Sequence, residues 1–321
     1  MKLYTFEIQG RRRLGAKQGA ELIDLASAYK IWRATFKAPP DAIPELPPDM
    51  LAFLSLGEPA LRAARDTLAF MARRPAAPVH ERLVYNFEEV YILAPLPRPG
   101  KILCTEWNYK TQAAELPGGK LPDEPIFYAK WPSAVVGPGV ALKLPKSLKH
   151  VDYGIQLAVV IGKRMKRVAP PDALAHVAGY TILNDVTARE LQLESNQLTL
   201  SKNCDTFCPL GPCVATVDQI LDPSDLKLRL LINNQVLQEA NSGEMALPIP
   251  ALLSKLSQII SLDPGDIVGT GTPAGTSLFR STPAFLKGGD ALQLEIDAVG
   301  ILENPVASRV VKKVDPEDEE D

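Results

Sequence analysis

The chain has 321 residues, and its 35 lysine and arginine residues against 38 aspartate and glutamate residues give a formal net charge of −3. This balance removes the electrostatic basis for nucleic-acid binding, and 46% hydrophobic with 23% charged residues excludes disordered and collagen-like classes. No apolar run reaches the ~18 residues of a membrane span. Residues 1–8 alternate like a strand and not like a signal peptide. We therefore expect a cytoplasmic protein without nucleic-acid or membrane partners.

In chain order, residues 1–75 predict a small N-terminal α+β domain of three short strands and two helices. The second helix is marked by apolar residues at three- and four-residue steps. A run of prolines then predicts a linker over 76–100. The strands are expected at 2–9, 13–16 and 21–25, the first helix at 26–36, and the second helix carries Leu61, Ala64, Leu68 and Met71.

Residues 101–310 predict one large β-dominated domain, because short β-branched runs alternate with glycine and proline. Residues 311–321 form an acidic tail that we expect to be disordered. The predicted fold class is therefore α+β, with β-structure dominant. Strands are expected at 126–129, 134–136, 155–161, 180–183, 226–232, 266–269 and 291–296, and helices at 109–115, 171–177, 187–196 and 249–260.

Histidine and cysteine are too scarce for zinc chemistry. The only histidines are His80, His150 and His176, and the spacing of the four cysteines fits no common zinc motif. We expect the cysteines to be reduced structural thiols.

Four segments carry polar residues in patterns that suggest a binding site. In a strand over 151–162, Asp152, Gly154 and Gln156 would share one face. Asp185 lies where a strand passes into a helix, and Arg189 and Gln192, three residues apart on that helix, can converge on one anion. The other two segments are a loop that carries Lys202 and a glycine-rich stretch, 268–275, that includes Thr272.

Together these segments resemble the fumarylacetoacetate hydrolase family, in order and spacing, from about Arg98 to Pro305. Supporting motifs include Asn108-Tyr109, the segment 132–138 and Leu262-Asp263-Pro264-Gly265-Asp266. The N-terminal unit resembles the cap of longer bacterial members. The resemblance implies a rolled β-sheet domain, usually dimeric, that uses Mg²⁺, Mn²⁺ or Ca²⁺ to act on 2-oxo and 1,3-dioxo acids.

The chain departs from the family at the metal ligands. The family motif Asp-Tyr-Glu-x-Glu-Leu places two metal-binding glutamates where this chain has Gly154 and Gln156, and only Asp185 remains of the three ligands. One carboxylate and one amide suit a hard divalent cation poorly. Asp152 lies one strand step further back and replaces a lost ligand only if the backbone is rebuilt. We expect no resident cofactor, or only weak Mg²⁺ or Mn²⁺ binding.

A second departure concerns the lid, where the family's histidine is replaced by Gln112, although Glu115 is retained. Glutamine cannot take up a proton near neutral pH. Glu106-Trp107 also replaces a pair that is usually small and apolar. The resemblance assigns substrate-facing positions to residues that are all present, namely Lys130, Arg189, Gln192, Lys202 and Thr272.

These observations lead to one main hypothesis and two alternatives. Asp185, Arg189 and Lys202 leave a nominal charge of +1, which favours a small 2-oxo or 1,3-dioxo acid. The main hypothesis is an enzyme with metal-independent or reduced hydrolase, lyase or isomerase chemistry, in which Glu115 or Asp185 moves protons and Gln112 positions water or substrate. One alternative is an inactive pseudoenzyme that binds a ligand or a partner, such as an active paralogue. The other is a metal-dependent acylpyruvate hydrolase or oxaloacetate decarboxylase with a rebuilt site. We expect a homodimer.

Overall fold

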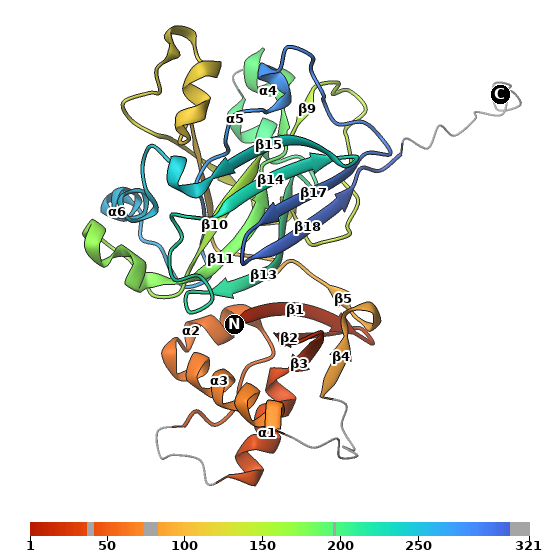
Figure 1. Cartoon of the computed structure of the whole chain (residues 1–321), viewed down its shortest axis with the longest axis vertical. Coiled ribbons are helices and arrows are strands. Elements are labelled where there is room, and N and C mark those ends of the chain that lie inside the picture. The colour runs from red at the N-terminus through yellow and green to blue at the C-terminus, as the bar shows by residue number, and fades with distance from the viewer. Residues whose placement is uncertain (37–41, 74–82, 195–196, 309–321) are drawn as a thin grey trace, which may run out of the picture.

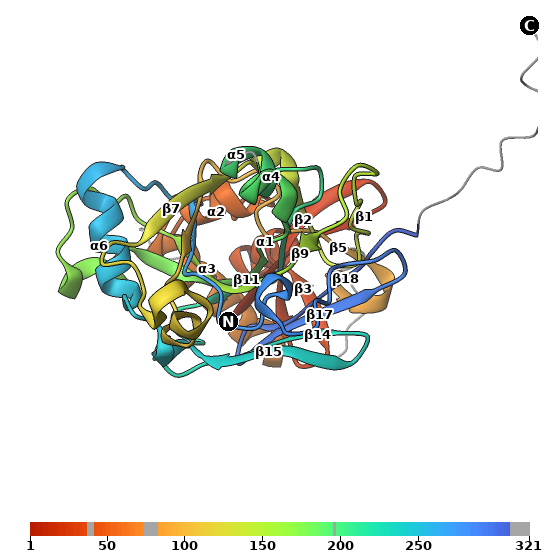
Figure 2. The same cartoon turned by 90° about the horizontal axis from the view of Figure 1, so that it is seen from above.

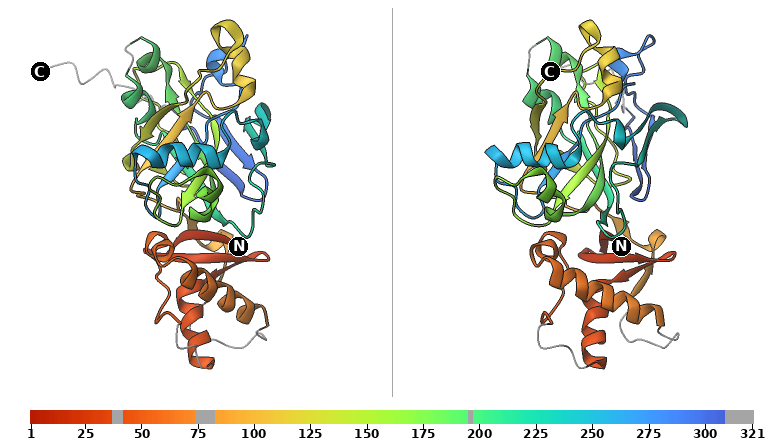
Figure 3. Two further views of the ribbon diagram at one scale, coloured as in Figure 1. Left: turned by 90° about the vertical axis from the view of Figure 1, so that its left-hand side faces the viewer. Right: turned by 60° about the vertical axis from the view of Figure 1, so that its left-hand side comes forward.

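The computed structural model describes residues 1–36, 42–73, 83–194 and 197–308. Figures 1 and 3 show a small N-terminal unit below a larger strand-rich body. The fold class is α+β with β-structure dominant, as the sequence predicts. Within the described residues, no helix is long and apolar enough to cross a membrane. The predicted acidic tail lies outside the described residues.

The N-terminal unit consists of a small sheet covered by helices. Two of the helix starts have a local cause: the carboxylates of Asp24 and Asp49 accept backbone N–H groups in the first turns of α1 and α2. In α3 the buried residues Ala60, Ala63, Ala64 and Thr67 repeat at helical spacing. The unit contains β1 (Lys2–Ile8), β2 (Arg11–Gln18), β3 (Glu21–Asp24), α1 (Leu25–Thr35), α2 (Met50–Ser55) and α3 (Glu58–Arg73).

The predicted linker is wrong for the part of 76–100 that the structure describes. Strand β4 (Val84–Asn86) pairs with β3, and β5 (Tyr91–Ile92) pairs with β1, so this stretch completes the N-terminal sheet. Apolar residues between the prolines, such as Tyr85, which is buried, allow these short edge strands. The N-terminal sheet also continues into the large body, because β1 pairs with β13 (Cys208–Thr216).

The large body is built on a sheet with the order β1-β13-β11-β10-β16-β6-β7. Its strands are β6 (Ile102–Glu106), β7 (Ile126–Lys130), β10 (Ile155–Ile161), β11 (Val177–Asn184) and β16 (Ile267–Gly269), and β8 (Val135–Val136) pairs with β13. A second sheet has the order β15-β14-β17-β18, and comprises β14 (Lys227–Ile232), β15 (Gln235–Asn241), β17 (Ala291–Ile296) and β18 (Gly300–Pro305).

Strand β10 is buried on both faces, which explains its continuous apolar sequence. Ile155 and Leu157 belong to one core cluster, while Ala158 and Val160 belong to the other. Strand alternation then places Gln156 on the same face as Ala158. The helix α6 (Ile249–Ile259) packs its apolar face, with Leu252 and Leu256, into the first cluster.

Several expected elements take a different form. The strand expected over 151–162 is divided into β9 (Val151–Asp152), which pairs with β12 (Thr187–Ala188), and β10. The helices expected at 109–115 and 171–177 are the 3₁₀ segments η2 (Lys110–Glu115) and η5 (Pro170–His176). The helix expected at 187–196 is the short α4 (Arg189–Leu193). The expected loop around Lys202 contains α5 (Leu198–Lys202). Seen from above, α4 and α5 lie close together (Figure 2).

Candidate active site

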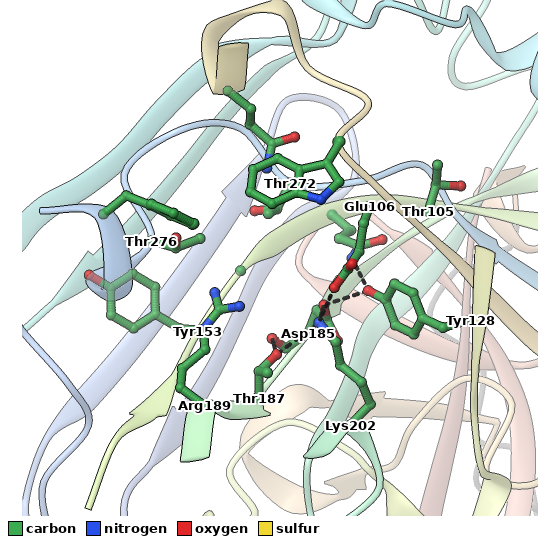
Figure 4. A pocket seen from close by; sticks show the side chains of 15 residues that line it. Thr105, Glu106, Tyr128, Tyr153, Asp185, Thr187, Arg189, Lys202, Thr272 and Thr276 are labelled. Carbon is green, nitrogen blue, oxygen red and sulfur yellow. Dashed lines mark hydrogen bonds and ion pairs between the residues drawn. The ribbon is translucent and has the colours of Figure 1, made fainter. Parts of the chain in front are cut away.

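A pocket lies at one end of the large sheet, where β6, β11 and β16 end and β7 and β10 begin. The antiparallel pairing of β10 with β11 and β16 brings these ends together. Glycine at position 269 leaves room for the Gln156 amide, because a Cβ there would lie 2.3 Å from Gln156 Oε1 and would displace it. The pocket (Figure 4) is lined by Thr105, Glu106, Trp107, Gln112, Tyr128, Tyr153, Gly154, Gln156, Asp185, Thr187, Arg189, Lys202, Thr272, Thr276 and Phe279.

At the base of the pocket, Asp185 is surrounded by hydrogen-bond donors. Lys130 Nζ lies 2.8 Å from Asp185 Oδ1, and Lys202 Nζ lies 2.7 Å from Asp185 Oδ2. The Tyr128 hydroxyl also donates to Oδ2. Figure 4 shows Lys202 and Tyr128 reaching Asp185. Both carboxylate oxygens are thus occupied by strong donors.

This cluster fixes the charge of its members. Burial alone would raise the pKa of Asp185, but the ammonium groups of Lys130 and Lys202 outweigh it and hold the pKa well below its usual range. Burial would lower the pKa of Lys130, but Asp185 raises it above its usual value. Burial and then Asp185 raise the pKa of Tyr128 far above its usual value. Asp185 therefore stays ionised near neutral pH, which does not suit the proton-moving role expected for it.

The two lysines differ in what they offer a ligand. Lys130 Nζ donates to Asp185, to the carbonyl of Val186 at 3.2 Å and to the carbonyl of Lys202 at 2.8 Å, which uses its three N–H groups. Lys130 does not line the pocket. Lys202 does, and besides Asp185 it contacts Thr187 Oγ1 at 3.0 Å. Lys202 therefore faces the ligand space, whereas Lys130 supports Asp185 from behind.

Arg189 is held by a buried carboxylate. Its Nε and Nη2 each lie 2.8 Å from Asp152 Oδ2, and Nη1 donates to Gln192 Oε1 at 2.7 Å. Asp152 also accepts the backbone N–H groups of Ser277 and Leu278. This explains why Asp152 does not replace a lost ligand: the break between β9 and β10 directs it to Arg189.

Glu106 extends this polar network at the mouth of the pocket. Gln192 Nε2 donates to Glu106 Oε1 at 3.0 Å, and Lys202 Nζ lies 3.4 Å from the same oxygen. The nominal charge of +1 expected from Asp185, Arg189 and Lys202 is thus wrong, because Glu106 and Asp152 add two carboxylates. No sequence pattern indicates that Glu106 contacts Lys202, since the two residues are 96 positions apart in the chain.

The lid side of the pocket carries the pair expected on η2. Gln112 is buried and accepts the N–H of Tyr109 at 3.3 Å, and Glu115 Oε1 accepts the N–H of Gly275 at 2.7 Å. Among the described residues Glu115 Oε2 has no hydrogen-bond partner. Burial raises the pKa of Glu115 and outweighs the N–H of Gly275 and the charge of Arg189. Glu115 is therefore suited to proton transfer.

The residues present do not fit a divalent cation. Asp185 is engaged by two ammonium groups, and Gly154 offers no ligand atom. The Gln156 amide is also engaged, since Oε1 accepts from Gly271 at 3.2 Å and Nε2 donates to the Tyr128 hydroxyl at 3.1 Å. No group of three or more His, Cys, Asp or Glu side chains is placed to hold a metal ion in the described ranges. A cation here would have to displace Lys202 or Lys130.

The structure thus gathers Gln112, Gln156, Asp185, Arg189, Lys202 and Thr272 around one cavity, with Gln192 and Glu115 beside it. Thr272 Oγ1 accepts from Gln238 Nε2 at 3.0 Å. The sequence missed Tyr128, although it lies two residues from Lys130 on β7 and strand alternation places both on one face. It also missed Tyr153, although this residue is the tyrosine of the family motif Asp-Tyr-Glu-x-Glu-Leu, and it missed Thr276 and Phe279, which carry no distinctive sequence pattern.

The fold and site define a β-dominated α+β protein with a polar pocket, lined by paired charges, for a small polar molecule. Residues 101–307 match the family Fumarylacetoacetate (FAA) hydrolase C-terminal. Similar proteins include the mitochondrial oxaloacetate tautomerase FAHD2A of Bos taurus, 43% identical over 265 residues that cover 82% of this chain and 81% of that protein. The fumarylacetoacetate hydrolase domain-containing protein 2 homolog of Dictyostelium discoideum is 37% identical over 306 residues, 92% of each chain.

Solved structures of fumarylacetoacetate hydrolase-type proteins also match this chain over most of its length. The fumarylacetoacetate hydrolase of Exiguobacterium antarcticum has a TM-score of 0.76 at 29% identity, covering 96% of this chain and 100% of that chain. The maleylpyruvate hydrolase of Sphingobium sp. SYK-6 in complex with manganese(II) and pyruvate has a TM-score of 0.72 at 29% identity, covering 96% and 99%. The chain therefore belongs to the fumarylacetoacetate hydrolase family, as the sequence motifs predict.

Proposed function

We propose that this protein binds a small 2-oxo or 1,3-dioxo acid and interconverts its keto and enol forms without a divalent cation. The observation that carries the proposal is the Asp185–Lys130–Lys202–Tyr128 cluster, in which two ammonium groups engage the one carboxylate that remains of the family's metal ligands. Relatives named oxaloacetate tautomerase support this class of substrate.

The chemistry requires one base and a stabilised enolate. In its ionised form, Glu115 takes the proton from the carbon next to the ketone, and its unpartnered Oε2 is the accepting atom. The electron pair of the C–H bond moves onto the ketone oxygen, where Lys202 stabilises the negative charge while Arg189 binds the carboxylate of the substrate. Returning the proton to that oxygen completes the enol. This reaction needs no activated water, so replacement of the lid histidine by Gln112 does not prevent it.

Two features favour the pseudoenzyme as the second candidate. Gln112 cannot exchange a proton, and each cation of the site already faces a carboxylate. Such a pocket would bind a ligand without converting it, alone or beside an active paralogue.

Homodimer formation and a cytoplasmic location also belong to the proposal. Light scattering tests the first, and cell fractionation tests the second.

Tautomerisation of oxaloacetate and of an acylpyruvate, followed by ultraviolet absorbance with and without EDTA, tests the proposal. We expect turnover that is indifferent to EDTA, is lost in Arg189→Ala and Glu115→Gln, and falls as acid protonates Glu115. Turnover that EDTA abolishes and Mn²⁺ restores would overturn metal independence. Stoichiometric ligand binding without turnover would overturn the enzyme and support the pseudoenzyme.

A further inference from the structure

At the mouth of the pocket, two consecutive residues, Glu106 and Trp107, both line the cavity. Consecutive residues of a regular strand point to opposite faces. Here Trp107 has φ +59°, in the left-handed region that bulky residues rarely adopt. The turn lets both side chains face the ligand space, and strained conformations of this kind persist where the surrounding structure holds them.

The neighbours of the turn hold it in place. Asn108 Nδ2 donates to the carbonyls of Thr270 and Leu247, at 2.8 and 3.1 Å. Asn108 Oδ1 accepts the N–H of Leu247 at 2.9 Å. The Trp107 ring lies edge-to-face with Phe279, with ring centroids 5.6 Å apart, and both rings line the pocket. Glu106 is therefore presented to the pocket by a fixed backbone.

The Glu106 carboxylate contacts two groups that would otherwise receive a ligand carboxylate. Gln192 Nε2 donates to it at 3.0 Å, and Lys202 Nζ lies 3.4 Å away. Figure 4 shows Glu106 reaching toward Asp185 and Lys202 from above. With Lys202 facing both Asp185 and Glu106, the protein itself supplies the anions that this cation attracts.

Arg189 is the remaining anchor for one ligand carboxylate. A guanidinium carries five N–H donors. Three are used, two by Asp152 and one by Gln192, so two are left for a ligand. Within the described part of the chain, the pocket residues Thr105, Tyr153 and Thr276 have buried hydroxyls with no hydrogen-bond partner. Figure 4 shows the hydroxyls of Thr105 and Tyr153 pointing away from Asp185 and Arg189, so Lys202 is the group left for the oxo oxygens of a ligand.

We infer that Glu106 makes this pocket select oxo acids with a single carboxylate over dicarboxylates. The inference rests on the proposed oxo-acid function and specifies its substrate class. One carboxylate binds Arg189, and the oxo groups bind Lys202. A second carboxylate would lie beside Glu106, where like charges repel and the Lys202 ammonium group is already shared with Asp185.

The test compares oxaloacetate with its 4-methyl ester, which has nearly the same shape and one charge fewer. Calorimetry gives Kd and the absorbance assay gives kcat/KM for both compounds. The wild-type protein should prefer the ester at least about 10-fold. Glu106→Gln should remove most of this preference by improving binding of oxaloacetate. Glu303→Gln is the matched control, because Glu303 is an exposed residue of β18 outside the pocket, and it should leave the preference unchanged.

A wild-type preference for oxaloacetate, or a Glu106→Gln protein with an unchanged ratio, would overturn the inference. The two measurements separate it from the proposed function. If calorimetry gives the expected preference but neither compound is converted, selection by Glu106 stands and the enzymatic proposal fails. If both are converted at equal kcat/KM, the enzymatic proposal stands and selection by Glu106 fails.

Discussion

Restoring the three replaced side chains should turn this pocket into a divalent-metal site. The variant carries Gly154→Glu, Gln156→Glu and Gln112→His, so that two new carboxylates join Asp185. A second and a third carboxylate ligand offset the cost of removing water from Mn²⁺ or Mg²⁺. The metal-free variant should be less stable than the wild type, and metal should recover much of the loss.

The structure gives the size of this penalty. The Tyr128 hydroxyl links Gln156 Nε2 at 3.1 Å to Asp185 Oδ2 at 2.5 Å, so carboxylates at both positions would lie within about 6 Å, a repulsion of about 3 kcal/mol at an effective dielectric constant of about 20. At position 154 a Cβ would lie 3.0 Å from Thr272 Oγ1, which requires a small shift of Thr272. Overpacking of this kind costs about 1–3 kcal/mol.

Thermal unfolding after dialysis against EDTA, repeated with Mn²⁺, measures the effect. At a metal concentration about 100 times Kd, binding stabilises by about 2.7 kcal/mol, which raises Tm by about 4 °C for a chain of 321 residues. The wild-type protein, treated identically, should not shift. A folded triple variant without a metal-dependent shift would refute the assignment of the ligand positions. An equal shift in the wild type would refute the statement that its residues do not fit a cation.

Three further predictions concern single residues. Asp185→Asn leaves two buried ammonium groups without their anion and should lower the free energy of unfolding by about 3–5 kcal/mol at pH 7. Because the folded-state pKa of Asp185 is lowered, this stabilisation is present above the unfolded-state pKa and is lost as the pH falls toward the folded-state value. Urea titrations of the two proteins should therefore converge in acid, and a difference that stays constant with pH would contradict this. Lys202→Met should abolish ligand binding, whereas Lys130→Met should mainly lower Tm, and equal effects on binding by calorimetry would contradict their different placement. Trp107→Gly relieves about 1 kcal/mol of backbone strain at the positive φ and loses about 1 kcal/mol of contact with the Phe279 ring. Tm should therefore change little, while kcat/KM should rise for oxo acids with longer chains, which fill the space of the indole. A large fall in Tm would show that the indole is structural.

Local residue patterns were sufficient to predict the family and most strands. The run at 155–161 predicts a strand because it is short and almost continuously apolar, as in strands that are buried on both faces, and β10 occupies this range. The spacing of Arg189 and Gln192 places them on one helix face, and their side chains do contact each other at 2.7 Å. Gly154, Gln156 and Gln112 were identified as departures because the family motif fixes their register in the chain.

What the sequence determined by itself is therefore the scaffold and the identity of the groups available for chemistry. Only the tertiary structure decided which charges face one another. Glu106 lies on β6, Asp152 on β9 and Lys202 on α5, and the sequence holds no record of which carboxylate each cation will meet. Ion pairing depends on distances of a few ångströms between segments far apart in the chain. For that reason a pocket expected to carry a net positive charge is one in which each cation already has a carboxylate partner.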